Sequence, residues 1–154
     1  ADEISHTGNI VVDSLVNHKY ALAQKDGIQF EARVFIPSVL PFQSGHLAII
    51  FGNLLENALE ACRKLPQEQR YIMLEATYIK EMLQICIKNG SPEKLKKDNS
   101  GRYLTTKKDT SCHGIGLASV EQALADYDGE LFTQYENGEF QASAVLYSNS
   151  IEEK

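Results

Sequence analysis

The chain lacks the features of membrane-spanning and secreted proteins. None of its apolar runs approaches the ~18 consecutive residues that a helix needs to cross a bilayer. Residues 1–6 also lack the basic and apolar regions of a signal peptide. We therefore expect this piece of the protein to be soluble. It begins with Ala1 rather than Met, which indicates a fragment or a processed chain.

Cysteine is scarce, and its spacing is uninformative for metal binding. Cys62, Cys86 and Cys112 are far apart and form no Cys-x-x-Cys pair. Cys62 and Cys86 fall in segments with an apolar pattern. This arrangement favours buried thiols in a reducing compartment over disulfides or zinc ligands.

An excess of positive charge is also missing. The net charge of −6 argues against generic nucleic-acid binding. Positive charge gathers locally, however, because residues 90–113 hold six Lys or Arg against three Asp or Glu. Such a basic segment in an acidic chain fits a local anion partner such as phosphate, or simply a Lys-rich solvated loop.

What is present is enough for one folded domain. The 154 residues, 43% of them hydrophobic, suffice for a substantial core. Hydrophobic periodicity predicts helices over 9–24, over 46–65 and from Gly114 to Tyr127. It predicts strands over 28–36, 71–79, 82–88, 131–135 and 140–146, with hairpin turns at Lys80-Glu81 and Asn137-Gly138.

The order of these elements predicts the fold class. Strands come in adjacent hairpins, helices stand singly between them, and no regular βαβ alternation appears. We therefore expect an α+β fold, a two-layer α/β sandwich with helices on one face of a mixed, mainly antiparallel sheet. It should form a single domain over 1–154, with its core at about 8–147.

The helix over 46–65 carries a polar stripe that needs an explanation. At about 100° per residue its apolar residues share one broad face. The stripe away from that face consists of Asn53, Asn57, Glu60 and Lys64. Asn is a poor helix former, so two of them one turn apart cost helix propensity. Solvation explains most such stripes, but a ligand would also explain this one, since amide oxygens suit Mg²⁺ shared with nucleotide phosphates.

A second candidate motif is His113-Gly114-Ile115-Gly116-Leu117, which we expect to open the last helix. Two glycines there allow backbone N–H groups to approach phosphate oxygens at the positive end of the helix dipole. A Rossmann motif is excluded because Ser119 stands in place of the third Gly and a polar loop precedes it. A flexible hinge is the alternative. The polar loop, about residues 90–113, is long enough to be a functional lid.

Taken in order, these motifs resemble a known family. An Asn-x-x-x-Asn-Ala helix, a hairpin ending in a polar turn, a basic lid and Gly-x-Gly-Leu resemble the ATP-binding catalytic domain of sensor histidine kinases, over about residues 8–147. That domain has the Bergerat-type fold of the GHKL superfamily, which also holds DNA gyrase, the ninety-kilodalton heat-shock chaperone and the mismatch-repair ATPases. The stretches 57–61, 105–107 and 113–117 most resemble the peptide-pheromone, quorum-sensing subclass.

The resemblance implies a role for each matching residue. Asn57 matches the Mg²⁺ ligand, and Asn53 matches the position of a catalytic Glu in the hydrolysing relatives. An amide cannot accept that proton, so phosphoryl transfer is favoured over hydrolysis and Asn53 and Asn57 form the expected catalytic pair. Lys107 or Lys108 would screen the triphosphate. The full set expected to bind ATP is Asn53, Asn57, Glu60, Lys64, Asn89, Lys107, Lys108, His113, Gly114, Ile115, Gly116 and Leu117.

Asn89 departs from the family pattern. It aligns with an Asp that accepts a hydrogen bond from the adenine amino group. An Asn oxygen still accepts that bond but lacks the charge, so weaker adenine affinity is expected.

The histidines lack the context of a phosphoacceptor, in which Asp or Glu and a nearby Asn follow the His. These residues are His6, His18, His46 and His113, and His46 is expected to be a capping or structural residue. The acceptor is therefore expected on a dimerisation domain outside this chain, with a response regulator downstream. The whole would be the cytoplasmic part of a membrane-anchored sensor kinase. Two rivals stay open: a gyrase-type ATPase using Glu56 or Glu60 as base, and a non-catalytic nucleotide-binding or dimerisation module.

Overall fold

The computed structural model of the protein describes residues 3–92 and 110–149, with the side chains of 110–115 left out. Its elements follow in the order α1 (Ile10–Lys25), β1 (Gln29–Phe35), α2 (Ser44–Arg63), a short 3₁₀ turn η1 (Gln67–Gln69), β2 (Tyr71–Ile79), β3 (Met82–Gly90), α3 (Thr110–Ala125), β4 (Glu130–Glu136) and β5 (Glu139–Tyr147). Every helix and strand expected from the sequence is present. The boundaries agree within two residues except at the start of α3.

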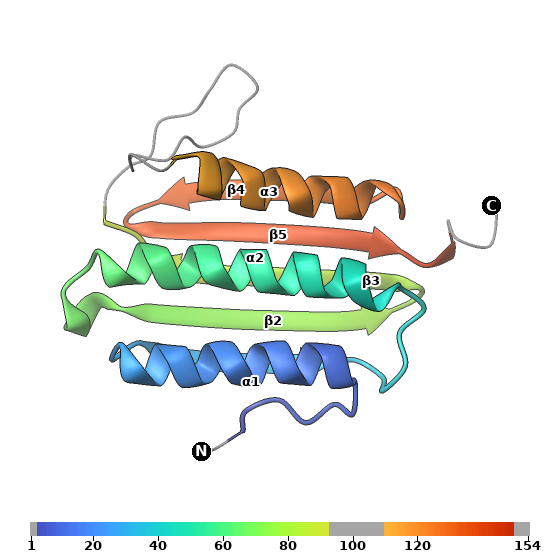
Figure 1. The fold of residues 1–154 in the computed structure, drawn as a ribbon, viewed down its shortest axis with the longest axis horizontal. Helices are drawn as coiled ribbons and strands as arrows, with labels where there is room; N and C mark the ends of the chain where they lie inside the picture. The colour runs from blue at the N-terminus through green and yellow to red at the C-terminus, as the bar shows by residue number, and fades with distance from the viewer. Residues whose placement is uncertain (1–2, 93–109, 150–154) are drawn as a thin grey trace.

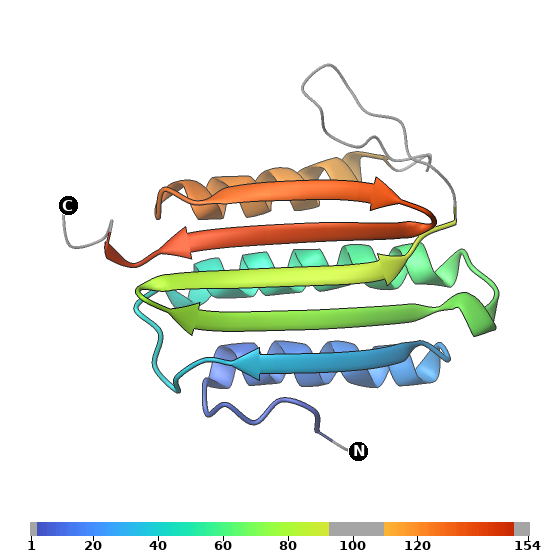
Figure 2. The same cartoon turned by 180° about the vertical axis from the view of Figure 1, so that it is seen from behind.

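The sheet has five strands in the order β1-β2-β3-β5-β4. β1 pairs with β2 in parallel, and every other neighbouring pair is antiparallel. All three helices lie on one face of the sheet (Figure 1), and the view from behind shows the other face without a helix across it (Figure 2). The predicted two-layer α+β sandwich with a mixed sheet is confirmed.

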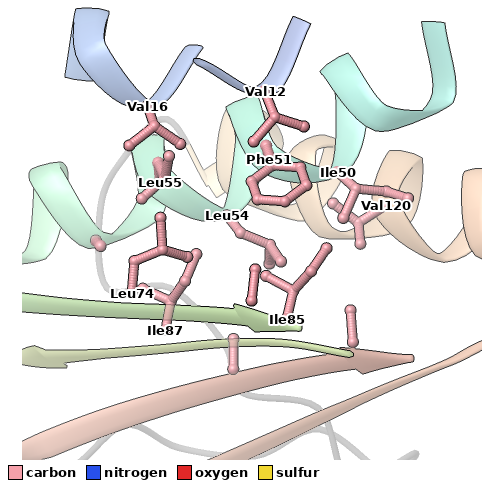
Figure 3. Close-up of a cluster of buried hydrophobic side chains, with 14 of the residues drawn as sticks. Val12, Val16, Ile50, Phe51, Leu54, Leu55, Leu74, Ile85, Ile87 and Val120 are labelled. Carbon is pink, nitrogen blue, oxygen red and sulfur yellow. The ribbon is translucent and has the colours of Figure 1, made fainter. Parts of the chain in front are cut away.

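The core lies between α2 and the middle of the sheet. Alternate residues of β2 and β3 are buried towards the helices, as the period of two in a half-covered sheet requires. Figure 3 shows side chains from all three helices meeting those of the strands. The labelled members of this cluster are Val12, Val16, Ile50, Phe51, Leu54, Leu55, Leu74, Ile85, Ile87 and Val120.

Both expected hairpin turns are present, and both place their central residues in the left-handed region. Lys80 and Glu81 have φ of 53° and 62°, and Asn137 and Gly138 have φ of 51° and 78°. Two consecutive residues with positive φ give the two-residue loop that matches the twist of the flanking strands. The Asn137-Gly138 turn uses the residues that adopt this conformation at least cost.

Both described cysteines are free thiols, but only Cys62 is buried as expected, whereas Cys86 is partly exposed. Cys62 is fully buried in α2, and its Sγ lies 3.3 Å from the carbonyl oxygen of Tyr71. Burial raises the pKa of this thiol, which keeps it protonated and unreactive.

The stretch before α1 is held against that helix by one carboxylate. Asp13 accepts hydrogen bonds from the Ser5 hydroxyl at 2.7 Å, from the Thr7 hydroxyl at 2.8 Å and from two backbone N–H groups, those of Thr7 and Gly8. Partial burial alone raises the pKa of Asp13, but these bonds to the charged form outweigh it, and the net pKa is lowered.

Stability should therefore depend on the ionisation of Asp13. A lowered folded pKa means that the carboxylate stabilises the fold fully above its unfolded pKa, about 3.9. That contribution is lost as the pH falls through the folded value below it. Denaturant unfolding of the parent and of Asp13→Asn should show a gap in the free energy of unfolding at neutral pH that narrows in acid. A gap that is constant with pH would contradict this assignment.

Candidate functional site

The candidate site lies between α2 and α3, which run antiparallel side by side above the sheet (Figure 1). Two pairs of neighbours show that the helices are antiparallel. His46, near the start of α2, is hydrogen-bonded to Tyr127, just after the end of α3, while Asn53, further along α2, lies beside Gly116, earlier in α3. The end of α2, the end of β3 and the start of α3 thus share one end of the molecule. This places the polar stripe of α2 beside the glycine motif of α3.

Asn53 and Gly116, 63 residues apart in the sequence, are in contact. A Cβ added to Gly116 would lie 3.4 Å from Asn53 Oδ1. Asn53 donates its Nδ2 hydrogen to the carbonyl oxygen of Ile49 at 2.9 Å, one turn back along α2. Since the amide nitrogen is engaged there, the oxygen is the atom that faces α3.

The rest of the polar stripe continues towards the end of α2. Asn57 and Glu60 are half-buried, and Lys64 is the exposed C-cap of the helix. Glu56 lies on another side of the helix. Its Oε1 is 2.9 Å from Lys19 Nζ on α1, and its Oε2 is 3.6 Å from Arg63 Nη1. Of this stripe, Asn53 is the residue that lies beside α3, while Glu56 is paired with Lys19 and Arg63.

Asn89 closes the site at the end of β3. It is 2% exposed, and its Nδ2 donates a hydrogen bond to the Gly90 carbonyl oxygen at 2.8 Å. With its nitrogen engaged there, the amide has its oxygen as an acceptor. An amide oxygen is the kind of group that can recognise an amino group.

The regular elements on both sides of the expected loop of about 90–113 extend further into it than the sequence pattern indicates. Gly90 belongs to β3, and the N–H of buried Ser91 donates to the Gly138 carbonyl oxygen at 2.8 Å. Strand pairing thus continues beyond the point where apolar periodicity ends. Residues 93–109, including Lys107 and Lys108, lie outside the described residues, so those two assignments stay predictions.

The glycine motif does not open α3. The helix begins at Thr110, so His113 and Gly114 lie in its first turns, and Gly116 lies deeper. The start of α3 could not be predicted from hydrophobic periodicity, because residues 110–113 are polar or small and show no apolar period. The side chains of His113 and Ile115 lie outside the described part. Leu117 is partly buried and packs against the core.

The residues present fit Mg²⁺ and a phosphate group, although neither is part of the structure. Among residues 3–92 and 116–149 no three His, Cys, Asp or Glu are placed to hold a metal. Mg²⁺ needs no such cluster, because it keeps several waters and takes one or two protein oxygens beside substrate phosphates. Gly116 supports the same fit, since a Cβ there would make only ordinary contacts and the fold itself does not require glycine.

Sequence reasoning missed one part of the region, the far end of the two helices. The sequence pattern predicts Tyr127 only as the last residue of the helix from Gly114. Its hydroxyl accepts a hydrogen bond from the Gln43 N–H at 3.1 Å and is hydrogen-bonded to His46 Nδ1. His46 is structural, as expected, but the N-cap of α2 is Gln43. No local signal in the sequence pairs residues 84 positions apart.

The described helices are not of the membrane-spanning kind. Within 3–92 and 110–149, none combines the length and the apolar character that crossing a bilayer requires.

With this geometry in place, the comparisons with known proteins define the family. A family model described as GHKL domain matches residues 43–146, about two thirds of the chain. The chain therefore belongs to the GHKL domain family. A comparison with curated protein sequences gave no significant match.

Solved structures of histidine kinases share the fold. The nucleotide-free catalytic domain of histidine kinase ThkA is 14% identical, with a TM-score of 0.71, and the match covers 97% of this chain and 99% of that one. The mycobacterial sensor histidine kinase MprB is 20% identical, with a TM-score of 0.59 and coverage of 90% and 93%. Full-length ShkA, solved in complex with AMPPNP, is 18% identical, with a TM-score of 0.67 and coverage of 94% and 30%. At these identities the likeness establishes the fold.

Two glycines of the region should respond oppositely to alanine. Gly116→Ala places its Cβ in ordinary contact with Asn53 and removes a helix-interior glycine, so stability should rise by ~0.5–1 kcal/mol. Gly90→Ala places its Cβ 2.7 Å from the Gln69 carbonyl oxygen. That overlap should cost ~1–3 kcal/mol. Denaturant unfolding measures both, and a destabilised Gly116→Ala would show that the fold itself needs this glycine.

Proposed function

We propose that this chain is the catalytic domain of a sensor histidine kinase. It binds Mg·ATP between α2 and α3 and transfers the γ-phosphoryl group to a His on a separate helical dimerisation domain. The observation that carries the proposal is that Gly116 faces Asn53 Oδ1, because this places the glycine motif beside an amide stripe suited to Mg²⁺.

The proposed roles are those that the family resemblance implies. Asn57 ligates Mg²⁺ between the phosphates, and the metal screens the charge of the triphosphate. Asn89 accepts a hydrogen bond from the adenine amino group. Gly114 and Gly116 let α3 approach the phosphates, with Lys107 or Lys108 adding positive charge. Catalysis then consists of positioning and charge screening rather than covalent chemistry by the protein.

We prefer transfer over hydrolysis because an amide, Asn53, stands at the position where the hydrolysing relatives carry a catalytic Glu. Asn53 cannot accept a proton from water. Glu56, one of two candidate bases for a gyrase-type ATPase, is paired with Lys19 and Arg63 on the α1 side. Glu60 shares the Asn stripe, so it is the residue on which the ATPase alternative depends.

The peptide-pheromone subclass is a finer proposal. It rests on the stretches 57–61, 105–107 and 113–117 and on Asn89 at the adenine position. A response regulator as the next phosphate acceptor and attachment to a membrane sensor belong to the same proposal.

Replacing Asn57 tests the metal site. Asn57→Ala should weaken Mg·ATP binding on the order of 10–100-fold by removing an oxygen ligand. Asn57→Asp keeps an oxygen and should retain Mg²⁺-dependent binding. Isothermal titration calorimetry with and without Mg²⁺ measures this, and Mg²⁺-free nucleotide affinity serves as the control. If Asn57→Ala binds Mg·ATP as tightly as the parent, the metal assignment is wrong.

The reaction itself is tested by incubating the domain with γ-labelled ATP and a helical acceptor hairpin from the same parent protein. Label should appear on the hairpin's His and be absent when that His is replaced by Gln. Steady-state phosphate release should stay slow, and Glu60→Gln should leave it unchanged. Rapid phosphate release that Glu60→Gln abolishes, with no labelled hairpin, would establish the ATPase instead.

A further inference from the structure

The end of α3 furthest from the glycine motif is joined to two other elements through one residue. Tyr127 is only 3% exposed. Its backbone carbonyl oxygen accepts a hydrogen bond from the Tyr147 N–H at the end of β5, at 3.3 Å. Its ring meets Phe42 edge-on, with centroids 5.0 Å apart and planes at 90°, and it meets His46 at 5.2 Å and 80°. Its hydroxyl reaches the start of α2.

The protons at this point can be assigned from the partners. The Gln43 N–H donates to the phenolic oxygen at 3.1 Å, so the phenolic hydrogen is free to donate to His46 Nδ1. Nδ1 then acts as an acceptor, and the ring hydrogen sits on Nε2, 3.3 Å from Asp126 Oδ2. In this hydrogen-bond series, the Gln43 N–H, the Tyr127 hydroxyl and the His46 Nε2–H therefore each have an acceptor.

This contact also caps a helix. Gln43 is the N-cap of α2, and its side chain makes no capping hydrogen bond. The first N–H groups of a helix have no partner within it. Tyr127 supplies an acceptor for one of them from another element, so the first turn of α2 and the end of α3 are tied by directional bonds.

We propose that Tyr127 is a positioning residue for the nucleotide site. By fixing the end of α3 to the start of α2 and to β5, it sets the distance between Gly116 and Asn53. The proposal rests on the proposed function, in which the phosphates lie at these two residues. Tyr127 does not touch the nucleotide.

The length of the helix makes this effect large enough to matter. Gly116 lies nine residues before the end of α3 at Ala125, which is about 14 Å along the axis. A tilt of about 5° at the Tyr127 end would therefore move Gly116 by roughly 1 Å. The buried residues in between include Val120, Ala123 and Leu124, whose apolar contacts have no directional preference. Hydrogen bonds at Tyr127 restrict the tilt that apolar packing allows.

A matched pair of variants tests the proposal. Tyr127→Phe removes the hydroxyl and keeps the ring. Tyr78→Phe is the control, because Tyr78 also meets Phe42 edge-on, at 6.1 Å, and also hydrogen-bonds through its hydroxyl, to Ser148 Oγ at 2.8 Å. Both variants remove one phenolic oxygen from the same aromatic cluster, but Tyr78 belongs to β2 and not to α3.

The readout separates positioning from general destabilisation. Tyr127→Phe should weaken Mg·ATP binding about tenfold, since displacements near 1 Å are costly at such sites. Adenosine, which would contact Asn89 on the sheet and carries no phosphate, should bind as it does to the parent. Tyr78→Phe should leave the affinities for Mg·ATP and adenosine unchanged. Its denaturation midpoint should shift by about as much as that of Tyr127→Phe.

His46→Phe provides a second variant that keeps the Tyr127 bond to Gln43 and removes only the acceptor of the phenolic hydrogen. It should produce the same selective loss in a milder form. The double variant should bind Mg·ATP no more weakly than Tyr127→Phe alone. If Tyr127→Phe fails to fold, the comparison of His46→Phe with Tyr78→Phe decides by the same criteria.

The outcomes distinguish this inference from the proposed function. A parent domain that does not bind Mg·ATP would refute the proposed function. A parent that binds, with Tyr127→Phe and His46→Phe binding equally well, would overturn only the positioning role. Equal losses for ATP and adenosine would likewise overturn it, because they would indicate general destabilisation.

Discussion

The packing of α2 across the middle of the sheet is the constraint on which the rest of the structure depends. Its buried residues cover much of its circumference, from Leu47 to Cys62, because α1 and α3 flank it while β2 and β3 lie beneath. A helix enclosed on three sides has only a narrow stripe left for polar residues. Asn53 and Asn57 occupy that stripe, and Asn53 lies beside α3, so the same packing that buries the core fixes where an amide can meet another element.

The second helix of the site has two described links to α2. Just after its end Tyr127 makes directional bonds to α2 and β5, and within the helix Gly116 lies beside Asn53 without steric overlap. In this GHKL domain one side of the candidate site is formed by α2 and β3. The other side is formed by α3, whose position we propose to depend on the contacts of Tyr127. Asn89, buried in β3, belongs to the side formed by α2 and β3.

Local sequence patterns predicted most of the helices, strands and turns correctly, because these elements depend on residues close together in the chain. The period of two in 71–79 and the Asn137-Gly138 turn depend on neighbouring residues only, and both were found as expected. The errors occurred where tertiary contacts override local pattern. β3 continues to Gly90 because β5 pairs with it there, and α3 begins at Thr110 although its first residues show no apolar period. Lys107 and Lys108 stay predictions, as does the ligation of Mg²⁺ by Asn57.

The sequence by itself determined the class of fold, the helix that carries the amides and the motifs whose order resembles a sensor kinase domain. These properties depend on the spacing of residue types along the chain, so they can be inferred from the sequence pattern without knowledge of tertiary contacts. Only the tertiary structure decided that Glu56 is held by Lys19 on the α1 side, that Asn53 Oδ1 faces Gly116 and that Tyr127 caps α2. Each of these depends on which way a side chain points between elements far apart in the sequence, and that direction is set by packing rather than by neighbours along the chain.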